Sequence, residues 1–243
     1  MHSTAQKALA EFVGTFALIF IGVGAIASAG IAGEGAGLVT IALAHGLAIA
    51  VMISTLGHVS GGHFNPAVTA AALATRKIAP AEAVMYWVVQ LAGATAAAAL
   101  AAAALPGGVD AVAGGTPLLN LDQISVGQGV LIEIVLTFFL VWVIFGTAMD
   151  PRGAFKQVAG LAIGLTITMD IMMGGPLTGA AMNPARTFGP ALVSGTWDNH
   201  WVYWAGPVIG GLLAGLVYDI VIMRDRGAPG PGGAAAAAEA AAD

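Results

Sequence analysis

Long uninterrupted apolar stretches, rather than alternating apolar and polar positions, dominate this chain. Six of these stretches approach the roughly 20 residues that a helix needs to cross the hydrocarbon of a bilayer. The predicted spans are Leu9–Gly30, Leu38–Leu56, Glu82–Leu105, Gly127–Ala148, Phe155–Met173 and Trp201–Met223. Two further apolar segments, Pro66–Ala74 and Pro184–Val193, have about half that length and open with proline, which is favoured at the first helical position. We therefore predict an all-α membrane protein with six transmembrane helices and two re-entrant half-helices.

One tripeptide occurs twice, as Asn65-Pro66-Ala67 and as Asn183-Pro184-Ala185, 118 residues apart. Gly46 and Gly164 repeat at the same offset. A repeat at about half of the chain length indicates one site that is built from two equivalent parts. Because each half holds three spans, the second half must run through the membrane upside down relative to the first. The two half-helices of this inverted repeat then enter from opposite faces and meet near the midplane.

Composition supports the membrane assignment. Hydrophobic residues make up 58% and charged residues 9% of the chain, against a usual charged share of about 25%. Six spans nearly exhaust the 243 residues, which leaves no room for a soluble catalytic domain. The absence of cysteine excludes disulfides and thiolate metal sites. We expect a single membrane domain over residues 1–226, with inverted repeats over about 8–105 and 127–223, and a low-complexity tail without function over 227–243.

Basic residues are confined to one side of the membrane in the six-span topology, apart from Arg186 beside the second tripeptide. The positive-inside rule, which counts lysine and arginine near the ends of spans, places both termini in the cytoplasm. The side predicted to be cytoplasmic carries Lys7, Arg76, Lys77, Arg152, Lys156, Arg224 and Arg226, and the opposite side carries Glu34, Asp110, Asp122 and Asp198.

The half-helices predict a site at the centre of the membrane. Each helix N-terminus presents unsatisfied N–H groups and the positive end of a dipole of about half a charge. Irregular backbone at this depth is tolerated only where it is buried or lines a watery cavity. Asn65 and Asn183 are expected to cap the half-helices and still offer side-chain donors to a pore. The expected pore carbonyls belong to Gly61, Gly62, His63, Phe64, Gly179, Ala180, Ala181 and Met182.

These motifs resemble the two signatures of the aquaporin, or major intrinsic protein, family. The resemblance covers essentially residues 10–223 and implies six tilted helices and two half-helices around one pore per subunit, usually in a homotetramer. It favours the water channels over the wider glycerol facilitators, which usually carry aspartate at the position of Thr187. The segments that carry it are Ser60-Gly-Gly-His-Phe-Asn-Pro-Ala-Val-Thr69, Thr178-Gly-Ala-Ala-Met-Asn-Pro-Ala-Arg-Thr-Phe-Gly-Pro190, Ala10-Glu-Phe-Val-Gly-Thr15 and His200-Trp-Val-Tyr-Trp-Ala-Gly-Pro207.

The resemblance also implies a constriction near the outer mouth of the pore, the selectivity filter. Its four positions map to His45, Ile171, Ala180 and Arg186, a set similar to that of plant tonoplast-type aquaporins. Typical water channels carry phenylalanine in place of His45 and histidine in place of Ile171. The apolar Ile171 removes a donor, so we expect a somewhat wider pore. We interpret Arg186 as the filter donor and cation repeller, with a structural ion pair or a carbonyl-bound clamp as the other interpretation.

Other polar residues in apolar surroundings have two interpretations. Glu11 and Glu133 lie near the start of the first helix of each half, and we interpret them as structural acceptors for loop backbone. A catalytic carboxylate pair is disfavoured because no nucleophile accompanies them. His45 is either a satisfied helix histidine or a filter residue whose titration could tune conduction. His58 and His63 are five residues apart, but no carboxylate or cysteine accompanies them, so we assign no metal site.

Together these features predict a passive channel for single-file water in a prokaryotic-type cytoplasmic membrane, with no cofactor and no nucleic-acid partner. The expected partners are water, small neutral solutes and the lipid bilayer. The nearest alternative is a wider facilitator that also passes glycerol, urea or ammonia. An ion channel or coupled transporter would need ion ligands in the pore, and an enzyme would need a nucleophile and a base, none of which is evident. A purely structural junction protein is disfavoured by the intact pore motifs.

Overall fold

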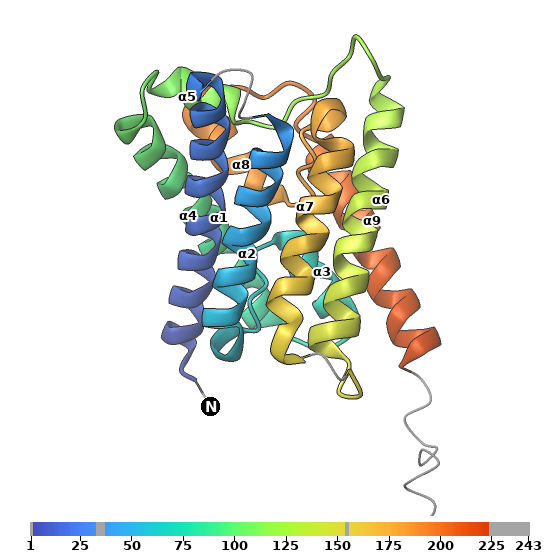
Figure 1. The fold of residues 1–243 in the computed structure, drawn as a ribbon. Helices are drawn as coiled ribbons and strands as arrows, with labels where there is room; N and C mark the ends of the chain where they lie inside the picture. Colours follow the sequence, from blue (N-terminus) through green and yellow to red (C-terminus); the bar gives the residue numbers. More distant parts are fainter. Residues whose placement is uncertain (1, 33–36, 154–155, 224–243) are drawn as a thin grey trace, which may run out of the picture.

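A computed structural model describes residues 2–32, 37–153 and 156–223, and within these ranges all regular structure is helical (Figure 1). Six of the described helices are long and apolar enough to cross a membrane. They are α1 (Thr4–Ala32), α2 (Leu38–Ser60), α4 (Pro80–Ala104), α6 (Val126–Ile144, continued by η2, Phe145–Met149), α7 (Ala159–Thr178) and α9 (Val202–Val217, continued by η4, Tyr218–Ile222). The predicted all-α fold class is confirmed. The predicted tail over 227–243 lies outside the described residues.

The two half-helices are α3 (Pro66–Ala74) and α8 (Pro184–Ser194). Each follows an asparagine whose side chain accepts a hydrogen bond from the backbone N–H two residues further on, at 2.8 Å for Asn65 and 3.0 Å for Asn183. This cap and the proline at the first position satisfy the local requirements of a helix start. In Figure 1, α3 lies in the lower half of the bundle and α8 in the upper half. Helix α3 packs against α9, and α8 packs against α4, so a helix of the other repeat supports each half-helix.

Helices α2 and α7 end later than predicted, at Ser60 and Thr178. Each ends at a glycine in the left-handed conformation, Gly61 with a φ of 91° and Gly179 with a φ of 79°. Glycine adopts this conformation without steric strain, so the helix continues up to it before the chain turns. The glycine-rich segments that precede the two half-helices therefore contain more helical residues than their composition suggests. Two short helices were not predicted, α5 (Val109–Gly114) and η3 (Lys156–Val158).

The repeated glycines of the sequence lie against each other in space. A Cβ atom at Gly46 would meet the carbonyl oxygen of Gly164, and a Cβ atom at Gly164 would meet the carbonyl oxygen of Gly46. Thr168 of α7 donates a hydrogen bond to the Ala42 carbonyl of α2 at 3.3 Å beside this contact. Small residues allow transmembrane helices to approach this closely. The equivalent positions of the two repeats thus form the crossing of α2 and α7.

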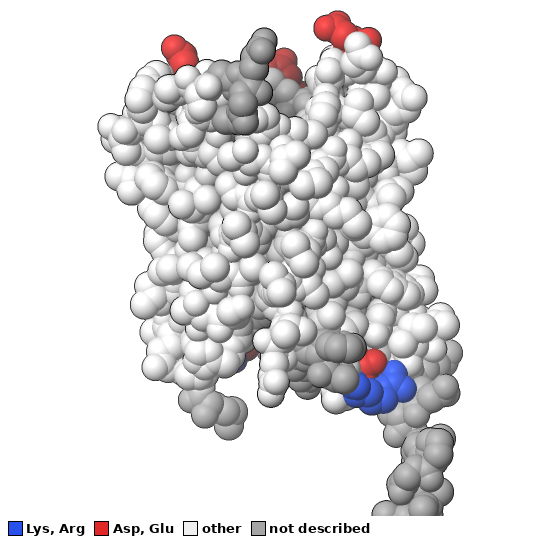
Figure 2. Space-filling view, in the orientation of Figure 1, with Lys and Arg blue, Asp and Glu red and all other residues white. Residues whose placement is uncertain are grey.

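The charged side chains on the visible surface lie at the two ends of the bundle. Figure 2 shows acidic side chains at the upper end, the visible lysine and arginine side chains at the lower end, and an uncharged belt between them. This distribution fits a molecule that spans a bilayer, because charges are costly within the hydrocarbon. The ion pairs at the basic end join Lys7 to Glu82 at 2.8 Å, Lys77 to Asp219 at 2.8 Å and Arg152 to Asp150 at 3.0 Å.

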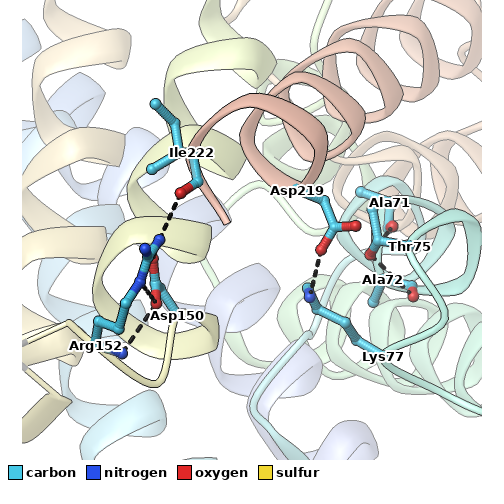
Figure 3. A network of polar contacts seen from close by, with 8 residues as sticks. All are labelled: Ala71, Ala72, Thr75, Lys77, Asp150, Arg152, Asp219 and Ile222. Carbon is cyan, nitrogen blue, oxygen red and sulfur yellow. Dashed lines mark hydrogen bonds and ion pairs between the residues drawn. The ribbon is translucent and has the colours of Figure 1, made fainter. Parts of the chain in front are cut away.

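Two of these ion-paired basic residues, Lys77 and Arg152, contact the end of the last described helix (Figure 3). Lys77, in the loop after α3, reaches Asp219 of η4, and Arg152, in the loop after η2, donates to the carbonyl of Ile222 at 2.5 Å. Partly exposed ion pairs contribute about 0–1 kcal/mol each. They therefore fix the position of the helix end more than they stabilise the fold.

We expect the substitution Gly164→Val to destabilise the protein by about 3 kcal/mol, because its Cβ would overlap a backbone carbonyl that cannot rotate away. Thermal unfolding in detergent, followed by circular dichroism, measures the effect. Gly24→Val is the matched control, because nothing lies within 4 Å of a Cβ at Gly24. Equal unfolding temperatures for the two variants would contradict the close crossing of α2 and α7.

Candidate functional site

A cavity follows the middle of the bundle and is lined by residues from both repeats. It shares Ile53 and His63 with a wider vestibule at the basic end of the molecule. Most of its wall is apolar and comprises Leu18, Ile49, Ile53, Val68, Leu140, Ile144, Ile163, Ile167 and Ile171. Its polar side chains are those of His45, His63, Asn65, Asn183 and Arg186. The two asparagines and all four residues of the predicted constriction thus border one space.

The two asparagines bind the opposite loop as well as their own helix. Asn65 Nδ2 donates to the Met182 carbonyl at 2.8 Å, and Asn183 Nδ2 donates to the Phe64 carbonyl at 2.9 Å. An amide nitrogen carries two hydrogens, so each asparagine keeps one further donor beside the cavity. The sequence indicated the cap and the central donor but not this reciprocal cross-link. The cross-link also occupies two carbonyls, those of Phe64 and Met182, that we expected to face the pore.

The loops that lead into the half-helices contain residues in the left-handed region. Phe64, Ala180 and Met182 have φ values of 47°, 43° and 51°. This conformation costs a residue with a side chain roughly 1–2 kcal/mol. The surroundings must therefore hold these loops in place by other interactions.

Buried carboxylates supply those interactions. Glu11 of α1 accepts hydrogen bonds from the His63 N–H at 2.9 Å, the Phe64 N–H at 2.7 Å and the Ser60 hydroxyl at 2.7 Å. Its fourth donor is the side-chain amide of Gln90, at 2.8 Å. Both the Glu11 and the Phe64 side chains are fully buried. The carboxylate thus satisfies backbone donors that no helix ladder can reach.

Glu133 of α6 binds the second loop in the same way. It accepts from the Ala181 N–H at 2.9 Å, the Met182 N–H at 2.8 Å and the Thr178 hydroxyl at 2.7 Å. Ser60 and Thr178 occupy equivalent positions, 118 residues apart like the two asparagines. The shared offset was the signal that could have identified both hydroxyls from sequence.

Two tyrosines complete these supports and were not assigned this role from the sequence. Tyr86 donates to the Ser60 carbonyl at 2.6 Å, and Tyr203 donates to the Thr178 carbonyl at 2.8 Å. Both tyrosines are fully buried, one on α4 and one on α9. A buried phenol hydroxyl requires a partner, and each carbonyl at the end of a helix requires a donor. The two needs are met together in both repeats.

Arg186 lies beside the second asparagine and is 4% exposed. Its guanidinium donates to the Gly115 carbonyl at 2.8 Å. Gly115 lies just after α5, in the connection between the repeats, where sequence offered no reason to place it near Arg186. This contact agrees with the carbonyl-bound interpretation and leaves further guanidinium donors available.

His45 is oriented by its own helix. Its Nδ1 donates to the Ile41 carbonyl at 2.8 Å, whereas Nε2 has no hydrogen-bond partner among the described residues. Ile171 and Ala180, which are 4% and 3% exposed, add apolar surface to the same cavity. Asp170 precedes Ile171 and is buried, but it does not line this cavity.

Comparison with known protein families identifies the family of this chain. The family described as Major intrinsic protein matches residues 1–218. The chain belongs to the major intrinsic protein family.

Aquaporins of plants are among the similar proteins. The chain is 47% identical to "Aquaporin TIP4-4" of Zea mays over 91% of this chain and 88% of that protein. It is 46% identical to "Probable aquaporin TIP3-2" of Arabidopsis thaliana, over 92% of this chain and 86% of that protein. A solved relative is the aquaglyceroporin from Plasmodium falciparum, with a TM-score of 0.82 and 26% identity, covering 91% of this chain and 98% of that one.

These relatives correct one expectation of the sequence analysis. TIP aquaporins are the tonoplast type, which belongs to the vacuolar membrane, so the expected location in a cytoplasmic membrane of prokaryotic type is wrong. The multi-pass arrangement itself agrees with the six membrane-competent helices of the described chain. The positive-inside rule reports on the orientation of spans. It carries no information about which membrane of a cell receives them.

We expect Glu11→Ala to prevent recovery of a monodisperse protein, because the N–H groups of His63 and Phe64 would lose their acceptor at a cost of about 1–3 kcal/mol each. Tyr86→Phe removes one hydroxyl from the same support and should lower stability by only about 1 kcal/mol. Gel filtration and thermal unfolding in detergent compare the two. A Glu11→Ala protein as stable as Tyr86→Phe would contradict a structural role for this carboxylate.

Proposed function

We propose that this chain is a passive transmembrane water channel that conducts water in single file and excludes ions and protons. The observation that carries the proposal is the central cavity, which is apolar along most of its wall and polar at the two asparagines and near Arg186. Water needs a few donors and acceptors to replace lost hydration, and apolar walls prevent it from binding too tightly. The names of the TIP aquaporin relatives support the same assignment.

The asparagine pair is proposed to orient the central water. The free amide hydrogens of Asn65 and Asn183 donate to the oxygen of this water, so its own hydrogens point away from the centre. A continuous proton wire is thereby interrupted. The N-termini of α3 and α8 face the same point, and their positive dipole ends oppose cations. The carbonyls of Gly61, Gly62, His63, Gly179 and Ala181 are proposed as the acceptors along the path.

His45, Ile171, Ala180 and Arg186 are proposed as the selectivity filter. Arg186 and the His45 Nε2 atom provide polar contacts, whereas Ile171 and Ala180 provide an apolar wall. A cationic guanidinium repels cations electrostatically but does not repel neutral water. Thr187 occupies the position at which glycerol facilitators usually carry aspartate, which favours water over larger polyols.

We further propose that the chain forms a single channel domain over residues 1–226 and assembles as a homotetramer with one pore in each subunit. The family relationship supports this assembly, and the apolar outer faces of α2 and α7 are compatible with burial against lipid or another copy. Native mass spectrometry from detergent tests it. A monomer as the sole species under gentle conditions would overturn it.

Stopped-flow light scattering of proteoliposomes tests the function. Under an impermeant osmolyte, vesicles with the protein should shrink several times faster than protein-free vesicles, and glycerol should enter slowly. Comparable permeability to water and glycerol would instead indicate a wider neutral-solute facilitator.

The combined substitution His45→Phe and Ile171→His should narrow the constriction and lower the permeability to urea or glycerol relative to water severalfold. Leu47→Phe with Met172→Phe is the matched control, because these neighbours on the same helices are 53% and 40% exposed on the outer face. If the first double variant passes larger solutes as readily as the parent, the filter assignment fails.

A further inference from the structure

Two histidines from different helices lie together at the basic end of the molecule. His2 precedes α1, and His58 lies in the last turn of α2. Their ring centroids are 5.7 Å apart and their planes meet at 72°. Both residues are exposed, and His58 lines the vestibule that leads to the central cavity. The water pathway proposed above uses neither side chain.

The separation of the two rings fits a shared metal ion. Imidazole nitrogen binds Zn²⁺ at about 2.0–2.1 Å, which places the metal roughly 3.2 Å from each ring centroid. Two such rings on one ion would be roughly 5.2 Å apart at a tetrahedral angle and roughly 6.4 Å apart if they were opposite. The observed 5.7 Å lies between these limits. Because both side chains are exposed, their torsions are free to rotate, and the site requires a rotation that brings a nitrogen of each ring to the same point.

The local structure fixes the backbone from which each histidine extends. Ser3, next to His2, accepts a hydrogen bond from the Gln6 N–H at 3.2 Å, and Gln6 Oε1 accepts one from the Ser3 N–H at 2.8 Å. This reciprocal capping box fixes the way in which the chain enters α1. His58 stands near the C-terminus of α2, where the helix dipole favours a cation. The neighbouring Lys7 is paired with Glu82 at 2.8 Å, which reduces its repulsion of a metal.

We propose that His2 and His58 bind a divalent transition-metal ion of the class of Zn²⁺, Ni²⁺ or Cu²⁺, which joins the start of α1 to the end of α2 at the vestibule. These ions favour imidazole ligands, whereas Mg²⁺ and Ca²⁺ favour oxygen. No group of three or more histidine, cysteine or acidic side chains suited to a metal occurs among the described residues. Water therefore completes the coordination, so the site is open and exchangeable, unlike a closed structural zinc site.

This site does not consist of His58 and His63, the two histidines that are five residues apart in the sequence. His58 and His63 are close in sequence, but the His63 ring hydrogen-bonds with Thr69 at 3.1 Å and packs edge-on against Tyr86. His63 is therefore directed behind the pore loop and not toward His58. The partner of His58 lies before the start of α1, 56 residues earlier in the sequence, and only the folded chain brings the two side chains near each other.

Isothermal titration of the full chain with Zn²⁺, without a histidine tag, tests the proposal. The expected result is saturable binding of one ion per chain, with no comparable signal for Mg²⁺. His2→Gln and His58→Gln should each weaken binding about tenfold or more, since even losing a supporting contact of a ligand has effects of this size. His200→Gln, at the opposite end of the molecule, is the matched control and should bind like the parent.

Cu²⁺ provides a second measurement that requires no substitution. The electron paramagnetic resonance spectrum of the Cu²⁺-loaded parent should carry hyperfine structure from two imidazole nitrogens, and either variant should retain one. Gel filtration of the variants verifies that they fold. Absence of saturable binding, a spectrum with one imidazole in the parent, or unchanged affinity in either variant would overturn the bridging site.

Discussion

A backbone N–H group at the depth of a membrane must find an acceptor, because no water is available to it in the hydrocarbon. The rest of this structure depends on how that requirement is met in the two pore loops. Glu11 and Glu133 each reach from the first helix of one repeat into a loop and accept from consecutive N–H groups. Without these acceptors the loops would have to become helical or leave the membrane.

The supported loops in turn position the half-helices and the asparagines. Asn65 and Asn183 bind each other's loop carbonyls, so the geometry of one repeat is set by the other. The half-helices are likewise packed against a helix of the opposite repeat. The site therefore does not form independently of the rest of the fold. It forms at the same contacts that hold the two halves of the chain together, and disturbance of either half affects both.

The central cavity combines a low density of polar groups with a largely apolar wall. Such a wall offers a water molecule few strong contacts, and the polar groups that interrupt it are held by hydrogen bonds to backbone. His45 is bound to Ile41, and Arg186 is bound to Gly115. A polar group that is already oriented needs no rearrangement when water arrives, which suits passive and rapid movement more than tight binding.

The sequence by itself determined the all-α membrane fold, the six spans, the half-helices and the family, because these depend on local signals. Apolar length, proline after asparagine and a repeat at constant offset are all visible in the linear chain. The predicted ends of α2 and α7 were less accurate. These helices continue up to Gly61 and Gly179, which act as C-terminal caps, whereas the prediction placed both glycines in loops.

Only the tertiary structure decided which partners the polar groups have. Nothing local relates Arg186 to Gly115, Tyr86 to Ser60, or His2 to His58, because these pairs are far apart in sequence and meet only after helices cross. Gly46 and Gly164 were visible as a repeat, but their direct contact depends on where α2 and α7 cross. For the buried groups among these, burial makes a partner necessary, whereas the folded path of the chain selects which partner it is.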